Sequence, residues 1–182
     1  MKRHIALHGL ALCCVGAFAG VSPVAAEQTR GVFLQEADGT RLRIGTLILA
    51  EDGDYTLRMA EEPFTDHFLS MRPFRCLEGA EKTWCHVPYP YAIRRNIAED
   101  TTDLEYDLLF LWKDRTDYGI DMWNGLYYRI EPEGEGLRGT LHEMDMDLLS
   151  APPPEGEMRP LRDQDIIETD PDSHWLPALI IE

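Results

Sequence analysis

Apolar and polar residues alternate along much of the chain after residue 28, in short runs that are separated by turn signals. In residues 41–59 the alternation occurs on both sides of Asp52-Gly53, a dipeptide typical of hairpin turns. Asp38-Gly39 marks an earlier turn, which follows a short apolar run at residues 31–34. Because a period of two is typical of strands with one buried face, this half of the chain predicts antiparallel hairpins.

Turn signals and apolar runs continue in the second half of the chain. Asn124-Gly125 lies between apolar residues and predicts a tight type I′ hairpin. A turn rich in Glu and Gly at residues 131–136 leads into another strand. In this last strand Leu137 and Leu141 are odd-numbered, whereas Met144, Met146 and Leu148 are even-numbered. We expect a β-bulge near residues 142–143, because one extra residue in a strand shifts the parity of the side chains that follow.

Residues 104–113 fit two kinds of structure. Alternate residues from Leu104 to Trp112 are apolar, which is the pattern of a strand. Thr102 and Glu105 instead have the spacing of a helix capping box, and several of the same apolar residues also lie on one helical face. We favour a strand, because the segments that follow form an antiparallel series.

These elements predict a mostly β protein with one small antiparallel β-barrel or sandwich and a minor helix. The architecture that we expect by analogy is a lipocalin-like up-and-down barrel, although the chain contains no lipocalin motif. Residues 27–150 form the expected β domain. Residues 151–182 begin as a Pro-rich linker and continue as an irregular acidic arm. We expect this C-terminal arm to pack back on the domain through its apolar end, residues 175–181.

The first 26 residues have the pattern of a cleaved signal peptide. A basic start at Lys2-Arg3 is followed by a charge-free apolar run at residues 5–21 and by small residues up to Ala26. The run is shorter than about 20 residues and contains three glycines, so we favour cleavage after Ala26 over a membrane anchor. A lipid on Cys13 is disfavoured, because Leu12 stands where a small residue is needed. The pattern predicts a secreted, periplasmic protein with no transmembrane span in the mature chain.

Charge and cysteine content narrow the class of protein. Cleavage would leave 15 basic and 33 acidic side chains, a net charge of −18. This balance argues against nucleic acids and anionic membrane surfaces as partners, since both would repel the protein. Cys76 and Cys85 would be the remaining cysteines, and in an oxidising compartment we expect them to form a disulfide. Their spacing differs from the Cys-x-x-Cys of redox enzymes, so the disulfide is interpreted as structural.

Sequence motifs for catalysis are absent. After the predicted cleavage site the chain has three serines, Ser70, Ser150 and Ser173, and none lies in a Gly-x-Ser-x-Gly motif. The two cysteines are expected to be bonded to each other, so neither provides a nucleophile. We therefore favour a non-enzymatic protein without a cofactor. The alternative is a periplasmic hydrolase that uses carboxylate and histidine side chains.

A second alternative is a periplasmic metal-handling protein. His142, Met144 and Met146 alternate, so on a regular strand they would share one face. Imidazole and thioether groups together suit Cu(I), whereas the carboxylates at residues 143, 145 and 147 suit harder ions. The competing interpretation is that the two methionines fill the core and the acids face solvent.

Residues 72–95 form the candidate ligand-binding region. This stretch has a net charge of +3 in an otherwise acidic chain, and Pro88 and Pro90 restrict its backbone. Rigid aromatic rings and arginines together suit the binding of an anionic group. The competing interpretation is that the arginines neutralise nearby acids such as Glu99 or Asp103. The candidate residues are Arg72, Arg75, Trp84, His86, Tyr89, Tyr91, Arg94 and Arg95.

The function that we expect is that of a periplasmic module that binds a small ligand, with an anionic molecule as one option, or an envelope protein. An open apolar interior would favour ligand binding, whereas a filled interior would favour a partner role. A cleft that joins His86 or His142 to a carboxylate with a shifted pKa would favour the enzyme.

Overall fold

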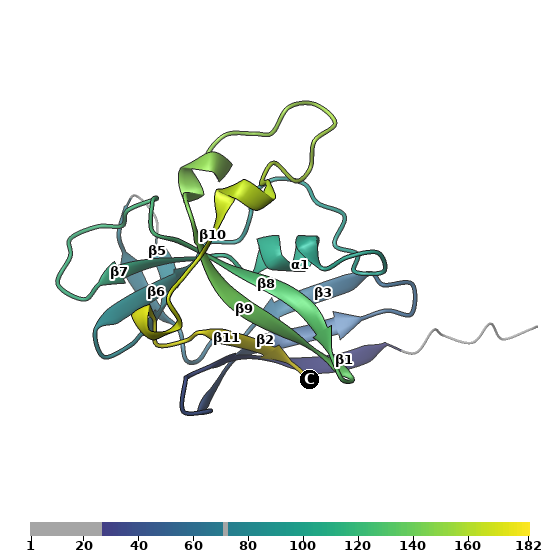
Figure 1. Cartoon of the computed structure of the whole chain (residues 1–182), viewed down its shortest axis with the longest axis horizontal. Helices are drawn as coiled ribbons and strands as arrows, with labels where there is room; N and C mark the ends of the chain where they lie inside the picture. The colour runs from purple at the N-terminus through teal and green to yellow at the C-terminus, as the bar shows by residue number, and fades with distance from the viewer. Residues whose placement is uncertain (1–26, 71–72) are drawn as a thin grey trace, which may run out of the picture.

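The computed structural model describes residues 27–70 and 73–182, so the predicted signal peptide and Arg72 lie outside the described residues. Within these two ranges, eleven strands form one antiparallel sheet that curls into a half-barrel (Figure 1). The mostly β, barrel-like fold class predicted from the sequence is confirmed. None of the helices in the described ranges has the length and apolar content that a membrane span requires.

The elements follow one another with few long connections. The strands are β1 (Gln28–Gln35), β2 (Arg41–Leu49), β3 (Tyr55–Met59), β4 (Thr65–Phe68), β5 (Pro73–Glu78), β6 (Lys82–His86), β7 (Phe110–Asp114), β8 (Gly125–Glu133), β9 (Gly136–Met144), β10 (Ile166–Glu168) and β11 (Ala178–Ile181). The helices are α1 (Thr102–Asp107) and the 3-10 helices η1 (Met146–Leu149), η2 (Asp163–Asp165) and η3 (Pro171–Ser173).

Neighbouring strands in the sheet are mostly neighbours in the chain. The order is β3-β2-β1-β11-β9-β8-β7-β6-β5-β4, and β10 pairs with the last residues of β9. The two edge strands, β3 and β4, are joined directly by residues 60–64. β11 lies in the middle of the sheet, where it pairs with β1 on one side and β9 on the other. The C-terminal segment is therefore a central part of the sheet.

Both predicted Asp-Gly turns are present. Gly39 and Gly53 each have a φ of +90°, in the region that favours glycine, and they connect β1 to β2 and β2 to β3. A Cβ atom on Gly53 would also lie 2.7 Å from the backbone nitrogen of Ala98. The second turn therefore needs glycine for its backbone angles and for the close approach of residues 95–98.

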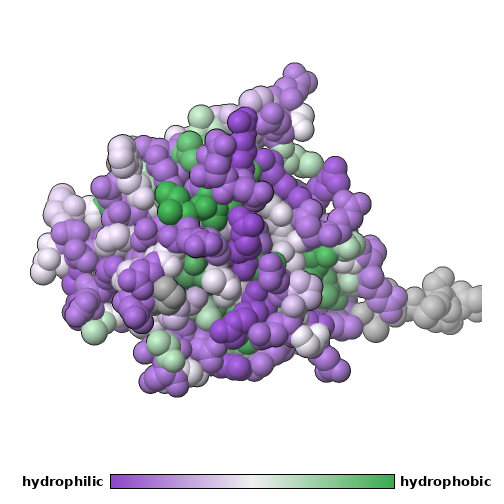
Figure 2. Space-filling view, viewed as in Figure 1, coloured by the Kyte–Doolittle hydropathy of each residue, from purple (hydrophilic) through white to green (hydrophobic). Residues whose placement is uncertain are grey.

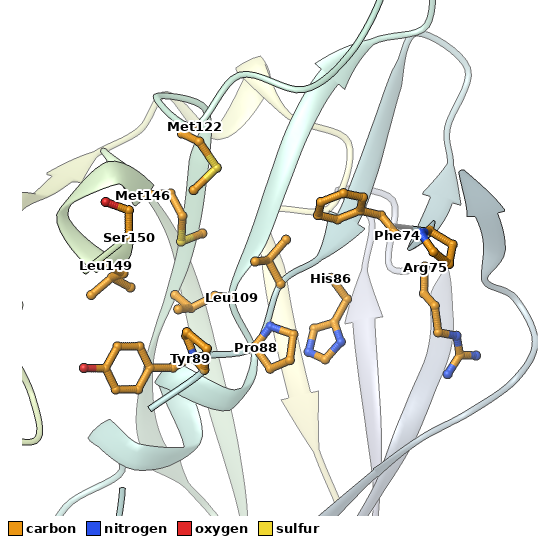
Figure 3. Close-up of a pocket in the computed structure, with 13 residues that line it drawn as sticks. Phe74, Arg75, His86, Pro88, Tyr89, Leu109, Met122, Met146, Leu149 and Ser150 are labelled. Carbon is orange, nitrogen blue, oxygen red and sulfur yellow. The ribbon is translucent and has the colours of Figure 1, made fainter. Parts of the chain in front are cut away.

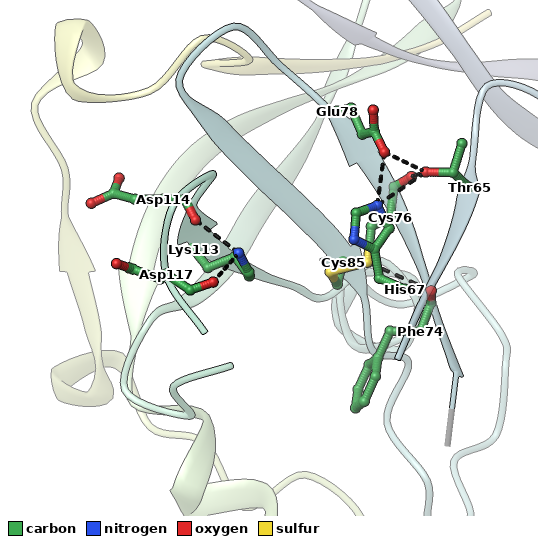
Figure 4. Close-up of a disulfide and its surroundings, with 9 residues drawn as sticks. All are labelled: Thr65, His67, Phe74, Cys76, Glu78, Cys85, Lys113, Asp114 and Asp117. Carbon is green, nitrogen blue, oxygen red and sulfur yellow. Dashed lines mark hydrogen bonds and ion pairs between the residues drawn. A yellow bond between two sulfur atoms is a disulfide. The ribbon is translucent and has the colours of Figure 1, made fainter. Parts of the chain in front are cut away.

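The predicted disulfide joins β5 to β6. Cys76 and Cys85 are directly opposite each other, with Cα atoms 3.9 Å apart, and both are buried (Figure 4). Closing a loop of this length contributes roughly 2–3 kcal/mol to the free energy of unfolding. Arg75 and His86 are the next pair along the same two strands. The disulfide therefore fixes the position of Arg75 relative to His86.

The prediction of a strand over residues 104–113 is wrong in its first half. The helix α1 ends at Asp107, and β7 begins at Phe110. Leu104 and Leu108 both pack into the interior of the half-barrel, as a helical face requires. Three carboxylates at residues 103, 105 and 107 are also buried. In a strand they would all point to one side, whereas the helix directs each carboxylate to a different partner, which a buried charge needs.

Asn124-Gly125 does not form a tight hairpin turn, contrary to the prediction. β7 and β8 are joined by a longer loop, residues 115–124, and Gly125 already pairs with Leu111 in the ladder. Glycine is needed there for another reason, because a Cβ atom on Gly125 would lie 2.5 Å from the carbonyl oxygen of Met144. Close packing of β8 against β9 therefore explains this glycine.

The bulge predicted near residues 142–143 is also absent from β9. Its pairing with β8 runs without a register shift from Gly136 to Met144. The parity of the apolar residues changes because the two faces of β9 meet different clusters of buried residues. Leu141 belongs to the cluster inside the half-barrel, and Met144 belongs to a second cluster on the other face.

The interior of the half-barrel is filled by side chains. Trp84, Phe110 and Tyr128 are fully buried there, together with residues from nearly every strand. The second cluster covers the outer face of β7, β8 and β9, beneath residues 87–93 and the segment after β9. A filled interior means that any large binding site must lie at the rim or on the outer surface.

Candidate functional site

A groove of about 680 Å³ opens at the rim of the half-barrel, where β5 begins and β6 ends (Figure 3). Pro73–Arg75 and His86–Pro90 form one side of it. Met122 and η1, including Met146 and Leu149, form the other side. Most of these side chains are apolar, and Arg75 and His86 lie together on the β5–β6 side. The groove thus combines apolar walls with a few polar groups, as ligand sites do.

The segment after β6 is held in place by hydrogen bonds at alternate residues. The backbone nitrogen of Val87 donates to the carbonyl of Leu109 at 2.9 Å, and that of Tyr89 donates to Tyr106 at 3.0 Å. Prolines stand at 88 and 90, where they fix φ and need no such bond. The Tyr89 ring meets the Tyr106 ring edge-on, with centroids 4.9 Å apart. This wall of the groove is therefore rigid without a bound ligand.

His86 is held in one tautomer. Its Nε2–H donates to the main-chain carbonyl of Asp107 at 2.8 Å, and its ring packs on Phe110 with centroids 5.3 Å apart. Burial lowers the pKa of His86, although the Asp107 carbonyl favours the protonated form. The imidazole is therefore neutral at pH 7, and its Nδ1 is a hydrogen-bond acceptor.

Arg75 lies between the groove and residues 60–64, which join the edge strands β3 and β4. Its Nη2 donates to the carbonyls of Ala60 and Glu61 at 2.6 and 2.9 Å. The guanidinium also lies over the Phe64 ring, 5.1 Å from its centroid. Its Nε and Nη1 make no hydrogen bond to another described residue. The guanidinium points toward residues 60–64 and away from Met122 and Met146, so Arg75 borders the groove at its edge (Figure 3).

The groove gathers three of the eight predicted ligand-binding residues, Arg75, His86 and Tyr89. Trp84 points into the interior and is fully buried. Tyr91 packs on Tyr89 and donates a hydrogen bond to the carbonyl of Ser150 at 3.2 Å, outside the set that lines the groove. Arg94 is exposed and also lies outside it. Side chains alternate between the two faces of β6, and this alternation places Trp84 on the interior face. The composition of residues 72–95 carries no information about which face a side chain takes.

Arg95 belongs to an ionic network around the buried carboxylates of α1. Its Nε and Nη2 donate to the two carboxylate oxygens of Asp107 at 2.9 and 3.0 Å, and the hydroxyl of Tyr55 donates at 2.9 Å. Arg159 bridges two acids: its Nε donates to Asp103 at 2.7 Å and its Nη1 donates to Asp100 at 2.8 Å. The competing interpretation, in which arginines pair with the protein's own acids, therefore describes Arg95, although its partner is Asp107.

The third buried carboxylate of α1 has neutral partners. Glu105 accepts hydrogen bonds from the backbone nitrogen of Ile130 at 2.6 Å and from the hydroxyl of Tyr127. Burial raises the pKa of Glu105, although these donors favour the ionised form. Glu105 lies outside the set of residues that lines the groove, and none of the described residues in that set is an acid. This arrangement does not favour the hydrolase alternative.

The three residues predicted to bind a metal are distributed over two elements. His142 and Met144 lie on β9, but Met146 begins η1, so one strand does not carry all three. The Nδ1–H of His142 donates to the carbonyl of Thr140 at 2.9 Å, and both methionines are buried in the outer cluster. In the described part of the chain, no three His, Cys, Asp or Glu side chains gather in a metal-binding arrangement.

A second histidine, which the sequence analysis did not single out, closes one end of the interior. His174 is buried, and its Nε2 lies 2.8 Å from a carboxylate oxygen of Glu143. Its ring packs edge-on against Trp84 and Trp112, with centroids 5.6 and 5.5 Å away. Burial lowers the pKa of His174, although Glu143 favours the protonated form. Because a substrate could not reach this buried ring, its role is structural.

The lowered pKa values of His86 and His174 predict that the stability of the protein depends on pH. In the unfolded chain both have a pKa near 6.5, above their lowered values in the folded protein. The unfolded state therefore binds protons first, and the free energy of unfolding falls as the pH drops below about 6.5, by up to about 1.4 kcal/mol per pH unit for each histidine. Urea unfolding at a series of pH values measures this slope. His174→Gln should make the slope shallower, whereas the partly exposed control His142→Gln should not.

No family model, curated protein or solved structure matches the chain. The functional interpretation therefore depends on the groove and on the surface around it. Arg75, His86 and Tyr89 were within reach of sequence reasoning, because cations and aromatic residues concentrate in one stretch. Met122, Met146 and Leu149 were not recognised as ligand contacts, because they lie far from that stretch in the chain.

Proposed function

We propose that the protein is a non-enzymatic periplasmic binding module, and that its groove takes a small, mainly apolar molecule with one acidic group. The observation that carries this proposal is the groove of about 680 Å³. Its walls are mostly apolar, and Arg75 and His86 border it on one side. Sites for small molecules commonly have volumes of about 300–1,000 Å³ and a few polar groups that fix orientation. The predicted signal peptide and the disulfide support a location in the periplasm.

The polar groups of the groove indicate the chemistry of the ligand. Arg75 has donors left for a carboxylate or another anion. His86, which is neutral, offers an acceptor to a hydroxyl or N–H group. The apolar walls, among them Phe74, Leu109 and Met146, suit a hydrocarbon or aromatic body. Since the disulfide fixes the Arg75–His86 pair, little ordering is needed when the ligand binds.

A dye pair of matched shape tests the proposal. 8-Anilinonaphthalene-1-sulfonate has an aromatic body and an anionic group, and N-phenyl-1-naphthylamine has nearly the same body without the charge. We expect Met122→Trp, which narrows the groove, to weaken binding of both dyes at least about tenfold in calorimetric titrations. Arg75→Gln should weaken binding of the sulfonate only, since glutamine retains a donor for the carbonyl of Ala60.

Leu148→Trp is the matched control, because Leu148 is half-exposed in η1 but does not line the groove. It should leave both dissociation constants unchanged. Circular dichroism spectra and melting temperatures establish that each variant is folded. Equal affinity of the wild type and Met122→Trp for both dyes would contradict the proposal.

A further inference from the structure

The loop between β7 and β8, residues 115–124, displays two exposed aromatic side chains. Tyr118 is fully exposed, and Trp123 is 72% exposed, whereas the other three tryptophans are buried or half-buried. The loop extends beyond the end of the sheet (Figure 1), and the surrounding surface is mostly hydrophilic (Figure 2). Aromatic residues exposed in this way are typical anchors of protein–protein interfaces.

The loop is held in one conformation by several hydrogen bonds. The Lys113 ammonium group is buried beneath it and donates to the carbonyls of Asp114 and Asp117 at 2.8 and 2.7 Å (Figure 4). The backbone nitrogen of Trp123 donates to the carboxylate of Asp121 at 3.0 Å. The carbonyl of Met122 accepts from the backbone of η1 at 2.9 Å. The two rings are thus presented on a pre-ordered loop, which reduces the entropy lost on binding.

Carboxylates surround the two rings. Tyr118 and Trp123 line a hollow of about 520 Å³ together with Asp117, Asp121 and Asp147, and these three aspartates are exposed. Lys113 also lines the hollow, but its ammonium group is engaged by the two carbonyls. The remaining cation of the loop, Arg115, is directed to the carbonyl of Ala80 in the β5–β6 turn, 3.5 Å away. The surface that faces a partner is therefore acidic and aromatic.

We propose that residues 115–124 and Asp147 form a docking surface for a partner protein that presents lysine or arginine beside apolar side chains. The partner's cations would pair with the aspartates and stack on the aromatic rings, and its apolar side chains would cover Trp123 and Tyr118. A second copy of this chain does not fit, because the full sequence carries a net charge of −16 and like surfaces would repel. Met122 lines both the groove and this hollow, but the docking proposal does not require a ligand in the groove.

Synthetic peptides without tryptophan provide defined probes. A cationic amphipathic peptide with repeated Lys-Leu-Ser units should bind and shift the tryptophan emission of the protein to shorter wavelength. Peptides with Glu-Leu-Ser units, which are negatively charged, or with Lys-Gly-Ser units, which lack the apolar side chain, should bind at least about tenfold more weakly. Trp123→Phe should abolish the emission shift. Binding of the cationic peptide should weaken as salt rises, since part of the attraction is between screened charges.

Variants at two sites separate docking from general charge attraction. One double variant combines Tyr118→Ser with Trp123→Ser, and the other combines Asp117→Asn with Asp121→Asn. Each should weaken binding of the cationic peptide at least about tenfold. The controls are Phe68→Ser, at an exposed aromatic residue on β4, and Glu131→Gln with Glu133→Gln, at exposed acids on β8. They should change the dissociation constant less than about twofold. Equal losses in variants and controls, or no binding by the wild type, would overturn the proposal. Tyr118→Ser alone keeps the test valid if a double variant fails to fold.

Discussion

Replacing Leu179 with aspartate is expected to prevent folding. Leu179 is fully buried in the interior cluster, at the centre of β11. An aspartate there would bury a carboxylate without a partner, which costs several kcal/mol, and would remove an apolar side chain. That loss is comparable to the total stability of a domain of this size, about 5–15 kcal/mol. Yield of soluble protein and the far-ultraviolet circular dichroism spectrum measure the effect.

Ile167→Asp is the matched control for this substitution. Ile167 also lies on a short C-terminal strand, β10, but its side chain is 60% exposed. We expect this variant to unfold cooperatively and to retain its free energy of unfolding within about 0.5 kcal/mol. If Leu179→Asp gave a folded protein with a cooperative melting transition, β11 would not be an essential part of the sheet.

Arg95→Ala is expected to lower the free energy of unfolding by about 3 kcal/mol, at the lower end of the range for breaking a buried ion pair. The Asp107 carboxylate is 7% exposed, so without Arg95 its charge would keep, among the described residues, only the hydrogen bond from the Tyr55 hydroxyl. The lower end applies because the Arg95 side chain is 47% exposed and solvent weakens the pair. Urea unfolding of the wild type and the variant gives the difference.

Two further variants identify the cause of the loss. Arg94→Ala removes an exposed arginine one residue away and should change the stability by less than about 0.5 kcal/mol. Arg95 has a φ of +57°, so Arg95→Gly removes the ion pair but relieves the backbone and should be less destabilising than Arg95→Ala. Similar small losses in Arg94→Ala and Arg95→Ala would show that the pair with Asp107 contributes little.

The parts of the fold that depend on local geometry were predictable from the sequence. Asp38-Gly39 and Asp52-Gly53 mark turns because glycine reaches positive φ in any context. Cys76 and Cys85 pair because a short turn brings them opposite each other. Asn124-Gly125 carries the same kind of signal, yet its glycine serves contact with β9. A dipeptide cannot distinguish these two requirements, since both select for the absence of a side chain.

The interactions that were missed join residues far apart in the chain. Residues 104–107 are helical because Glu105 reaches Tyr127 and Ile130, and Asp107 reaches Tyr55. The alternation of apolar residues carries no information about these partners. The sequence indicated one part of the candidate site, because cations and aromatic residues concentrate in residues 72–95. Met122 and Met146 are distant from that stretch in the chain, and the fold brings them to the groove.

Because β11 joins the two halves of the sheet, the complete fold cannot form until its last strand has emerged from the ribosome. Until then, β1 and β9 each have an edge without its native neighbour. Gly31 and Glu182 exchange backbone hydrogen bonds of 2.7 and 3.1 Å across roughly 150 intervening residues, so the closing contact is very distant in sequence. Such contacts form slowly. The complete sheet is therefore expected to form only after β11 has paired with both β1 and β9.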